Sequence, residues 1–342
     1  MKSKATSFDI AHLAGVSQST VSRALRNSPL VNPETRERIK AIAKELNYKV
    51  DKNASNLRSQ QSHTIALLLF EDPTSDESQI NPFFLSMLGS ITRACGDNGY
   101  DLLVSFQRLE ENWHAEYEDT HKADGIILLG YGDYNDYQEK LHQLEQNQTR
   151  YVLWGALQQD QPGISIACDN FTGGYEITRH LIAKGRTKIA FIGSASEGSP
   201  EFFDRYKGSC EAQTDANLAV RKSLQIDAIT TEQSGYAAAL QLLAKQQPFD
   251  AIVCASDLIA VGVIKALRDK QINVPKDVAV VGYDNIPLSE FTRPALTTVQ
   301  QDTKLAGKIL VETLIAHIHG KPVTSRSLPA TLIVRESCGA LL

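Results

Sequence analysis

The pattern of apolar and polar positions changes twice along the chain, near residue 50 and again at residue 63. Before residue 50, apolar side chains recur at three- and four-residue spacing, which predicts amphipathic helices. From residue 63 onward, short apolar runs alternate with amphipathic segments, which predicts strands and helices in turn. We therefore expect three parts, comprising residues 1–49, 50–62 and 63–342.

The first predicted helix has clear boundaries. Thr6 is a preferred N-cap residue, and Asp9 lies three positions later, close to a capping-box pattern. Gly15 interrupts the helical pattern and permits a sharp turn. The apolar face of this helix is predicted to consist of Ile10, Leu13 and Ala14.

A second helix is predicted to begin after Ser17, with Val21, Ala24 and Leu25 on its apolar side. The polar residues left to face outward are Gln18, Ser19, Ser22, Arg23 and Arg26. In a helix-turn-helix, the N-terminal residues of the second helix meet base edges in the major groove. Gln can bond bidentately to adenine and Arg to guanine. An ordinary helical hairpin with a polar surface would show the same local pattern.

A third helix is predicted to begin at Asn32-Pro33 and to run to about Asn47. Residues 50–62 are then polar apart from Ala54 and Leu57. This segment fits a flexible linker, or a hinge helix that orders on DNA and inserts Leu57 into a minor-groove step.

Residues 63–342 alternate between the two patterns throughout. The predicted strands are 64–70, 101–106, 125–129, 151–154, 188–192, 223–226, 251–254, 278–281 and 330–336. The predicted helices are 83–98, 110–122, 135–147, 173–184, 203–215, 234–245, 258–270 and 303–319. This alternation predicts two doubly wound α/β lobes. We place one at about 63–168 with 303–330 and the other at 169–302 with 331–342.

Charge is distributed unevenly between these parts. The net charge of the chain is −5, but residues 1–61 contain 11 Lys and Arg against 5 Asp and Glu, a net of +6. The remainder therefore carries −11. A basic head on an acidic body favours local attraction to a polyanion such as DNA.

Other classes of protein find little support in the sequence. No apolar run reaches 18 residues and the chain starts Met1-Lys2-Ser3-Lys4, so we expect no membrane span and a cytoplasmic location. The five cysteines are scattered without Cys-x-x-Cys spacing, which predicts reduced thiols and no zinc site. Motifs for dinucleotides, nucleoside triphosphates and serine hydrolases are absent. We expect no cofactor, no metal and no catalytic residues.

Ligands of open α/β lobes bind beyond the carboxyl ends of the strands. Polar or aromatic residues near the predicted strand ends are therefore candidates: Asp72, Trp154, Asp169, Asp257 and Asp284, with Arg205 near the start of a helix. Carboxylates and an Arg suit the neighbouring hydroxyls of a polyol, and Trp or Phe can pack on a sugar ring. Asp257 fits a helix cap equally well.

The chain resembles the lactose/galactose repressor (LacI/GalR) family over essentially its whole length. The motifs that carry the resemblance are Asp9-Ile10-Ala11-His12-Leu13-Ala14-Gly15-Val16-Ser17, Thr20-Val21-Ser22-Arg23, Asn81-Pro82-Phe83-Phe84, Asp124-Gly125-Ile126-Ile127, Val281-Gly282-Tyr283-Asp284-Asn285 and Pro294-Ala295-Leu296-Thr297-Thr298-Val299. The resemblance implies an N-terminal three-helix helix-turn-helix domain and a two-lobed α/β periplasmic-binding-protein-like domain with doubly wound parallel sheets.

The resemblance also implies roles for individual residues. Those at base-reading positions are Gln18, Ser19 and Arg23, and those at phosphate-contacting positions are Thr6, Ser17, Thr20 and Ser22. Arg26 stands where Asn is common and adds a backbone or base contact. Ala54 and Leu57 match hinge residues that enter the minor groove, although Val50, Asp51 and Ser55 depart from the usual hinge residues. Arg205 and Asp284 match ligand-binding positions, with Asp169 and Asp257 nearby. Phe84 is a further candidate for effector binding.

The implied function is a homodimeric, sequence-specific transcriptional repressor of carbohydrate utilisation genes that binds an inverted-repeat operator in double-stranded DNA. A small-molecule effector, for which we favour a sugar, would bind between the lobes and lower operator affinity. A purine corepressor or a phosphorylated partner protein would fit the same fold. A sugar-binding protein without DNA affinity, or an enzyme, would not require the basic helical head.

Overall fold

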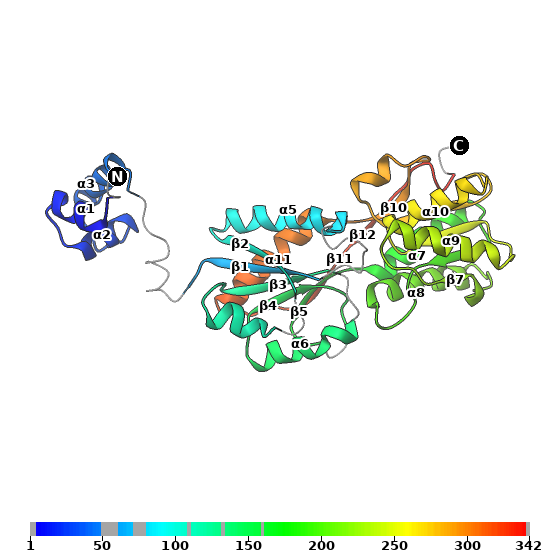
Figure 1. The fold of residues 1–342 in the computed structure, drawn as a ribbon, viewed down its shortest axis with the longest axis horizontal. Coiled ribbons are helices and arrows are strands. Elements are labelled where there is room, and N and C mark those ends of the chain that lie inside the picture. The colour runs from blue at the N-terminus through cyan, green and yellow to red at the C-terminus, as the bar shows by residue number, and fades with distance from the viewer. Residues whose placement is uncertain are drawn as a thin grey trace. The chain divides into compact units, whose positions relative to one another are not determined.

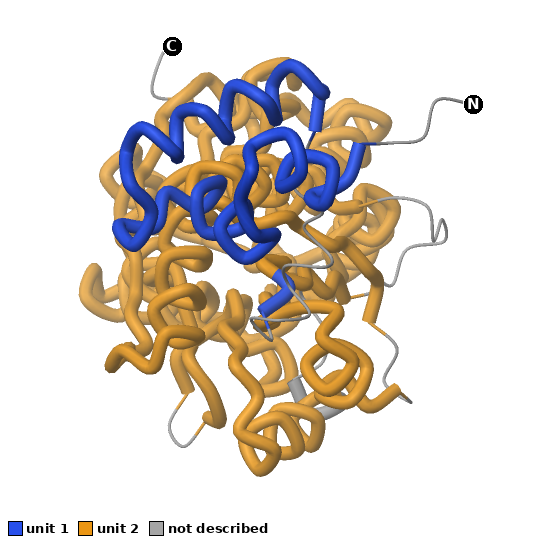
Figure 2. Tube along the Cα trace, turned by 90° about the vertical axis from the view of Figure 1, so that its left-hand side faces the viewer, with its two compact units in different colours: residues 1–62 blue, residues 63–342 orange. Residues whose placement is uncertain are grey.

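The structure is a computed structural model that describes residues 5–48, 61–70, 80–107, 111–130, 134–158 and 161–339, without the side chains of 134–136. Contacts within the chain divide it into two compact units, residues 1–62 and 63–342 (Figure 2). The predicted hinge residues Ala54 and Leu57 and the candidate Asp72 lie outside the described residues.

The first unit contains the three predicted helices, α1 (Ser7–Ala14), α2 (Gln18–Leu25) and α3 (Pro33–Glu45). Its small core contains Ile10, Val21 and Ile39, one from each helix. Leu13 is 59% exposed, so its predicted place in the apolar face is wrong. Ala11 is buried instead, because α2 and α3 pack on the side of α1 that carries Ile10, Ala11 and Ala14.

The second unit begins with a fully parallel six-stranded sheet in the order β11-β5-β4-β3-β1-β2. Its strands are β1 (Thr64–Leu69), β2 (Asp101–Phe106), β3 (Gly125–Leu129), β4 (Tyr151–Trp154), β5 (Ile164–Cys168) and β11 (Arg326–Leu328). The central strands are continuous apolar runs because helices cover both faces of the sheet (Figure 1).

Successive side chains of a strand point to opposite faces, which divides the apolar residues of this sheet into two clusters. Leu67 and Ile127 pack with α5 (Pro82–Asp97) and α11 (Thr303–Ile318). On the other face, Leu68 and Leu128 pack with α6 (Tyr134–Gln146) and with Tyr117 of a π-helical turn, η1 (Ala115–Asp119).

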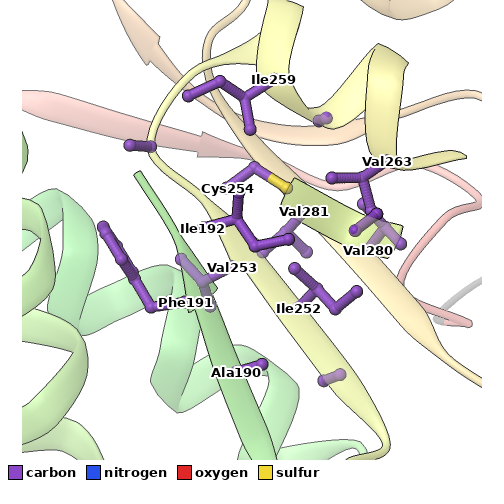
Figure 3. Close-up of a cluster of buried hydrophobic side chains, with 14 of the residues drawn as sticks. Ala190, Phe191, Ile192, Ile252, Val253, Cys254, Ile259, Val263, Val280 and Val281 are labelled. Carbon is purple, nitrogen blue, oxygen red and sulfur yellow. The ribbon is translucent and has the colours of Figure 1, made fainter. Parts of the chain in front are cut away.

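The second sheet has the order β12-β10-β9-β8-β6-β7 and is parallel except for β12, which runs antiparallel to β10. Its strands are β6 (Ile189–Ile192), β7 (Gln225–Ile226), β8 (Ala251–Cys254), β9 (Ala279–Asp284), β10 (Thr297–Gln301) and β12 (Ala330–Ile333). Its helices are α7 (Asn170–Ala183), α8 (Pro200–Asp215), α9 (Glu232–Ala244) and α10 (Asp257–Asp269). Figure 3 shows part of its core, where Ile259 and Val263 of α10 face the apolar side chains of β6, β8 and β9.

The chain passes between the two sheets three times: from β5 into α7, from β10 into α11, and from β11 into β12. The fold class predicted from the sequence is therefore confirmed: a helix-turn-helix domain precedes a two-lobed α/β domain with doubly wound, largely parallel sheets.

Several predicted elements differ from the observed ones. The helix predicted at 110–122 is shorter in the structure, because its described part is helical only over residues 113–119, which end in the π-helical turn η1, before a left-handed His121 (φ 55°). The predicted strand 223–226 is a 3₁₀ turn, η2 (Lys222–Leu224), followed by the two-residue β7. The strand predicted at 278–281 extends to Asp284, and β5, β10 and β11 were not predicted.

Paired glycines bring the helices of the second lobe into close contact. A Cβ at Gly174 of α7 would lie 2.2 Å from the carbonyl oxygen of Arg205, and one at Gly208 of α8 would lie 2.1 Å from that of Phe171. Both helices therefore carry a glycine where the backbone of the other passes. This fixes the position of α8, and with it Arg205, against α7.

Candidate DNA-binding face and ligand site

The boundaries of α1 and of the turn after it follow from local hydrogen bonds. The backbone N–H of Asp9 donates to Thr6 Oγ1 at 3.3 Å, and the Thr6 N–H donates to Asp9 Oδ2 at 2.7 Å. These bonds lower the pKa of the exposed Asp9 carboxyl, the backbone bond most. Gly15 adopts the left-handed conformation (φ 61°) that ends α1 and redirects the chain into α2. The capping box is thus complete, and the Thr6 hydroxyl already takes part in it.

Short hydrogen bonds hold most polar side chains at the start of α2. Ser17 Oγ caps the helix by accepting from the Thr20 N–H at 3.2 Å, and it lies 2.8 Å from Ser19 Oγ. Gln18 Nε2 donates to Ser7 Oγ at 2.8 Å. These residues form one ordered polar face.

The two arginines of this region differ. An amino group of Arg26 donates to Ser22 Oγ at 2.6 Å and its Nε donates to the Ser22 carbonyl at 3.2 Å, so the side chain lies along its own helix. Arg23 is exposed and makes no hydrogen bond or ion pair with any part of the chain that the structure describes. Among these residues, Arg23 is therefore the one whose guanidinium is available to an external partner.

Two other arginines of this unit have structural partners. Arg36 donates to the carbonyls of Ser28 and Val31 at 3.1 and 2.9 Å, and Arg38 donates to that of Ala14 at 3.0 Å. Arg36 and Arg38 thus stabilise the turn after α2 and the end of α1 through hydrogen bonds within the unit.

Arg205 lies at the centre of a network of buried polar groups in the second lobe, and its side chain is 1% exposed. Its Nε donates to Asn170 Oδ1 at 2.8 Å, and an amino group donates to the carbonyl of Ala255. Its guanidinium carbon lies 3.8 Å from the centre of the Tyr283 ring. Arg205 was expected near a helix start but lies in the second turn of α8, where it ties α7, β8 and β9 together.

Asp284, the second candidate ligand residue of this lobe, lies next to Arg205. Its Oδ1 is 3.7 Å from the Arg205 guanidinium and accepts from Gln301 Nε2 at 2.7 Å. Burial raises the pKa of Asp284 to about 7, while Arg205 and Gln301 act in the opposite direction. The residue also has φ 113°, a conformation that L residues rarely adopt. A strained, buried carboxyl with a raised pKa is typical of a functional site.

Asp257 is fully buried and does not cap its helix. Ser256 is the N-cap of α10 and accepts from the Ile259 N–H at 3.3 Å. Asp257 instead accepts from the Ile286 N–H at 2.9 Å and from Thr298 Oγ1 at 2.6 Å. Burial, and secondly the charge of Asp284, raise the pKa of Asp257 well above its usual range. The alternative of a helix cap is therefore wrong for Asp257.

Asp169, unlike Asp257, does cap a helix, and that helix is α7. Its side chain accepts from the Thr172 N–H at 2.9 Å and caps α7, and it is half-buried. Its neighbour Asn170, and not the Asp169 carboxylate, accepts the hydrogen bond from Arg205 Nε.

The first lobe contributes aromatic residues. Phe84 and Trp154 are buried, and both pack around Phe83, with ring centres 5.1 and 6.2 Å from that of Phe83. Trp154 is the last residue of β4, at the carboxyl end of the sheet. Apolar residues of the second lobe, Leu258 and Ile286, belong to the same cluster.

Sequence reasoning missed several buried polar groups near these elements. Glu201, in the first turn of α8, accepts from the Ala156 N–H at 3.0 Å and so joins the two lobes, and burial raises its pKa. Asn81 Nδ2, at the start of α5, and Gln107 Oε1, directly after β2, are buried and have no hydrogen-bond partner among the described residues. Gln107 is a polar residue directly after a strand, so its position in the sequence was enough to make it a candidate ligand residue.

A hollow of about 240 Å³ lies elsewhere, between α11 and the segment before β11, where Glu312 and Arg326 are among its lining residues. None of the predicted effector residues that the structure describes lines it. In the described part of the chain, no group of His, Cys, Asp and Glu could hold a metal ion. No described helix is both long enough and apolar enough to cross a membrane.

A helix-turn-helix that presents Gln and Arg, followed by two α/β lobes of which the second holds a buried polar network, defines a DNA-binding regulator with a small-molecule-binding domain. Residues 8–51 match the family described as bacterial regulatory proteins, lacI family, and residues 178–338 match the periplasmic binding protein-like domain. The chain belongs to the lacI family and is a transcriptional repressor controlled by a small-molecule effector.

The similarity extends over nearly the full length of individual relatives. The ribose operon repressor of Escherichia coli K12 is 30% identical over 97% of this chain and 98% of its own length. The HTH-type transcriptional regulator RegA of Clostridium saccharobutylicum is 34% identical over 96% of this chain and 98% of its own length. The solved complex of the transcriptional regulator CelR with cellobiose has a TM-score of 0.73 and 29% identity, covering 97% of this chain and 99% of that one.

Proposed function

We propose that this regulator is a homodimer whose effector is a sugar, and that sugar binding releases it from an inverted-repeat operator of carbohydrate utilisation genes. The observation that carries the proposal is the buried network of Arg205, Asp284 and Gln301 at the carboxyl ends of β9 and β10. The names of two relatives, a ribose operon repressor and a regulator in complex with cellobiose, support the same class of ligand.

The chemistry of the lobes suits a polyol. Carboxylates and amides can bond neighbouring hydroxyls, and an aromatic ring can pack on the apolar face of a sugar. The proposed contacts are Phe84 and Trp154 of the first lobe with Arg205 and Asp284 of the second, together with Asp72, Asp169 and Asp257. The amide atoms of Asn81 and Gln107 that have no partner within the described part of the chain are proposed to add a donor and an acceptor for a hydroxyl.

On the DNA side, Gln18, Ser19 and Arg23 are proposed to meet base edges. Phosphates are proposed to be contacted by Thr6, Ser17, Thr20, Ser22 and Arg26, and the minor groove by Ala54 and Leu57. The exposed Arg23 is suited to bidentate guanine recognition, which discriminates by about 1–3 kcal/mol for each base pair. Because its target is DNA, the protein is proposed to act in the cytoplasm.

A homodimer is proposed because one short α2 reads only half of an inverted repeat. The surface proposed for contact between the two subunits is an apolar one on the second lobe. It includes Leu288 of η3 (Pro287–Glu290), which is 43% exposed, and Phe291 directly after η3, which is 71% exposed. A Phe291→Asp variant is expected to sediment as a monomer at concentrations where the wild-type chain sediments as a dimer. An unchanged sedimentation coefficient would exclude this surface.

The dimer is proposed to have two arrangements, one that binds the operator and one that is released from it. The effector can change operator affinity only if its own affinities for these two arrangements differ. A sugar that favours the released arrangement by 100-fold would shift the equilibrium by about 2.7 kcal/mol. The hydrogen bond from the Ala156 N–H to Glu201 is a buried polar contact between the two lobes, which are proposed to move against each other when the effector binds.

The test is a titration of the full chain on DNA selected by that chain from a randomised duplex library. Ribose and cellobiose are the first probes, and hypoxanthine and guanine are the comparison ligands. We expect a sugar to weaken DNA binding and the purines to leave it unchanged. The sugar proposal is wrong if sugars have no effect while a purine strengthens binding, and DNA binding without a steep salt dependence would contradict the operator contacts.

A further inference from the structure

The bond between Gln18 and Ser7 joins two helices at a point where a base reader is proposed. Gln18 is the first residue of α2 and Ser7 the first of α1, and Gln18 Nε2 donates to Ser7 Oγ at 2.8 Å. Both side chains are half-buried. The other polar bonds on this face, Ser17 to Ser19 and Arg26 to Ser22, stay within α2 and its cap.

We propose that Ser7 is a positioning residue that orients the Gln18 amide for reading adenine. The inference rests on the proposed function, in which Gln18 meets a base. A Gln amide has two N–H donors and one carbonyl acceptor. When one N–H is bound to Ser7, the acceptor and a second N–H remain. These two groups match the N6 amino group and N7 of adenine in the major groove.

The opposite amide orientation would present different chemistry. With Oε1 directed at Ser7, both N–H groups would face outward and would match the two acceptors of guanine, O6 and N7. A Gln18 side chain without the Ser7 bond would also sample several rotamers, and binding would have to order it. A serine hydroxyl can accept or donate, so Ser7 holds the amide in place, and the observed orientation, with Nε2 bound to Ser7, is the one that leaves the adenine-matching pair outward. In that orientation Ser7 contributes to both the choice of base and the affinity, without contacting the base.

Removal of the Ser7 hydroxyl should leave the fold of the unit intact. Helix α1 is capped by Thr6 and Asp9, whose reciprocal bonds do not involve Ser7. The core of the unit contains Ile10 and Ala14 from α1, on positions other than Ser7. A Ser7→Ala change thus removes one side-chain partner of Gln18 and no cap or core contact.

The experiment measures binding of the full-length chain to DNA selected from a randomised duplex library, with each base pair of the half-site then changed in turn. Gln18→Ala identifies the base pair that Gln18 reads. Ser7→Ala is expected to reduce the preference for adenine at that pair by about fivefold for each half-site, which corresponds to about 1 kcal/mol. Preferences at all other pairs should be kept.

Two further variants separate positioning from a general structural effect. Ser7→Thr keeps a hydroxyl and is expected to restore the adenine preference. Ser28→Ala removes a hydroxyl of the same unit that accepts from the Leu30 N–H, and it should leave every base preference unchanged.

Three results would overturn the inference. They are an unchanged profile for Ser7→Ala, an equal loss of affinity for every sequence, or guanine as the base preferred at the pair read by Gln18. If Gln18→Ala itself leaves all base preferences unchanged, it is the proposed role of Gln18 that fails.

Discussion

Asp284 shows how burial changes the chemistry of a single residue. Water would keep this carboxyl ionised at neutral pH, but burial opposes the charge and raises its pKa to about 7 although Arg205 lies 3.7 Å away. A group whose pKa is higher in the folded state binds its proton more tightly there. Its contribution to stability is therefore complete below the unfolded pKa, near 4, and is lost as the pH rises to about 7.

We therefore expect Asp284→Asn to flatten the dependence of stability on pH. Relative to this variant, the wild-type chain should lose stability between pH 5 and 7, by up to about 1 kcal/mol per pH unit, and the difference should level off above pH 7. Urea unfolding midpoints of both proteins across pH 5 to 8 provide the measurement. Parallel curves would mean that Asp284 is ionised throughout this range.

Ile10 and Leu13 lie three residues apart in α1 and look equivalent in the sequence. The structure buries Ile10 completely and leaves Leu13 59% exposed. We expect Ile10→Ala to destabilise the first unit by about 2–4 kcal/mol and Leu13→Ala to change its stability by less than about 0.5 kcal/mol. Hydrogen exchange of residues 5–48 in the full chain measures both effects. Similar losses for the two variants would show that Leu13 is buried too.

At the scale of elements, the contact between α7 and α8 sets the position of Arg205. Both helices have a glycine where the backbone of the other passes, and no side chain fits there. Arg205 then meets Asn170 at the start of α7. Gly174 and Gly208 therefore affect the polar network indirectly, because they allow the close approach of the two helix backbones that carry Asn170 and Arg205.

Gly174→Ala is expected to push α8 away from α7 and to weaken effector binding. The new Cβ would lie 2.2 Å from the Arg205 carbonyl oxygen, so we expect a loss of about 1–3 kcal/mol of stability. Gly262→Ala is the matched control, because its Cβ would lie 2.0 Å from the Glu232 carbonyl oxygen between α9 and α10. Calorimetric titration of both variants with the sugar that binds the wild-type chain should show the larger loss of affinity for Gly174→Ala. Equal losses would show that the α7–α8 contact has no special effect on the site.

For the whole molecule, the two units divide the tasks of recognition and response. Residues 1–62 and 63–342 are separate compact units, and each holds its own set of side chains for which a function is proposed. A change that removes one base contact should therefore leave the ligand site as it was.

Arg23→Ala tests this division. We expect it to abolish operator preference, with a loss of about tenfold or more for each half-site, because a bidentate base contact is removed. Effector affinity measured without DNA should be unchanged. Loss of both activities would indicate unfolding or coupling between the units, and an unchanged operator preference would remove Arg23 from the base-reading residues.

The sequence by itself determined the features that depend on neighbours along the chain. Thr6 with Asp9 and Gly15 mark the ends of α1, because caps and left-handed turns are formed within a few residues. The central strands were also recognisable, since a strand covered on both faces must be apolar throughout. Asp284 and Arg205 became candidates through their positions near a strand end and a helix start, and the family resemblance pointed to the same two residues.

Only the tertiary structure decided which partner each polar group has. Asp257 accepts from Thr298, 41 residues away, and Glu201 accepts from Ala156, 45 residues away, so neither role can be recognised from local spacing. Gln301 lies on β10, a strand that the sequence pattern did not reveal. Leu13 is exposed because the packing of α2 and α3 selects one side of α1. Periodicity identifies an apolar side of an element, whereas contacts between distant segments decide which residues are buried and paired.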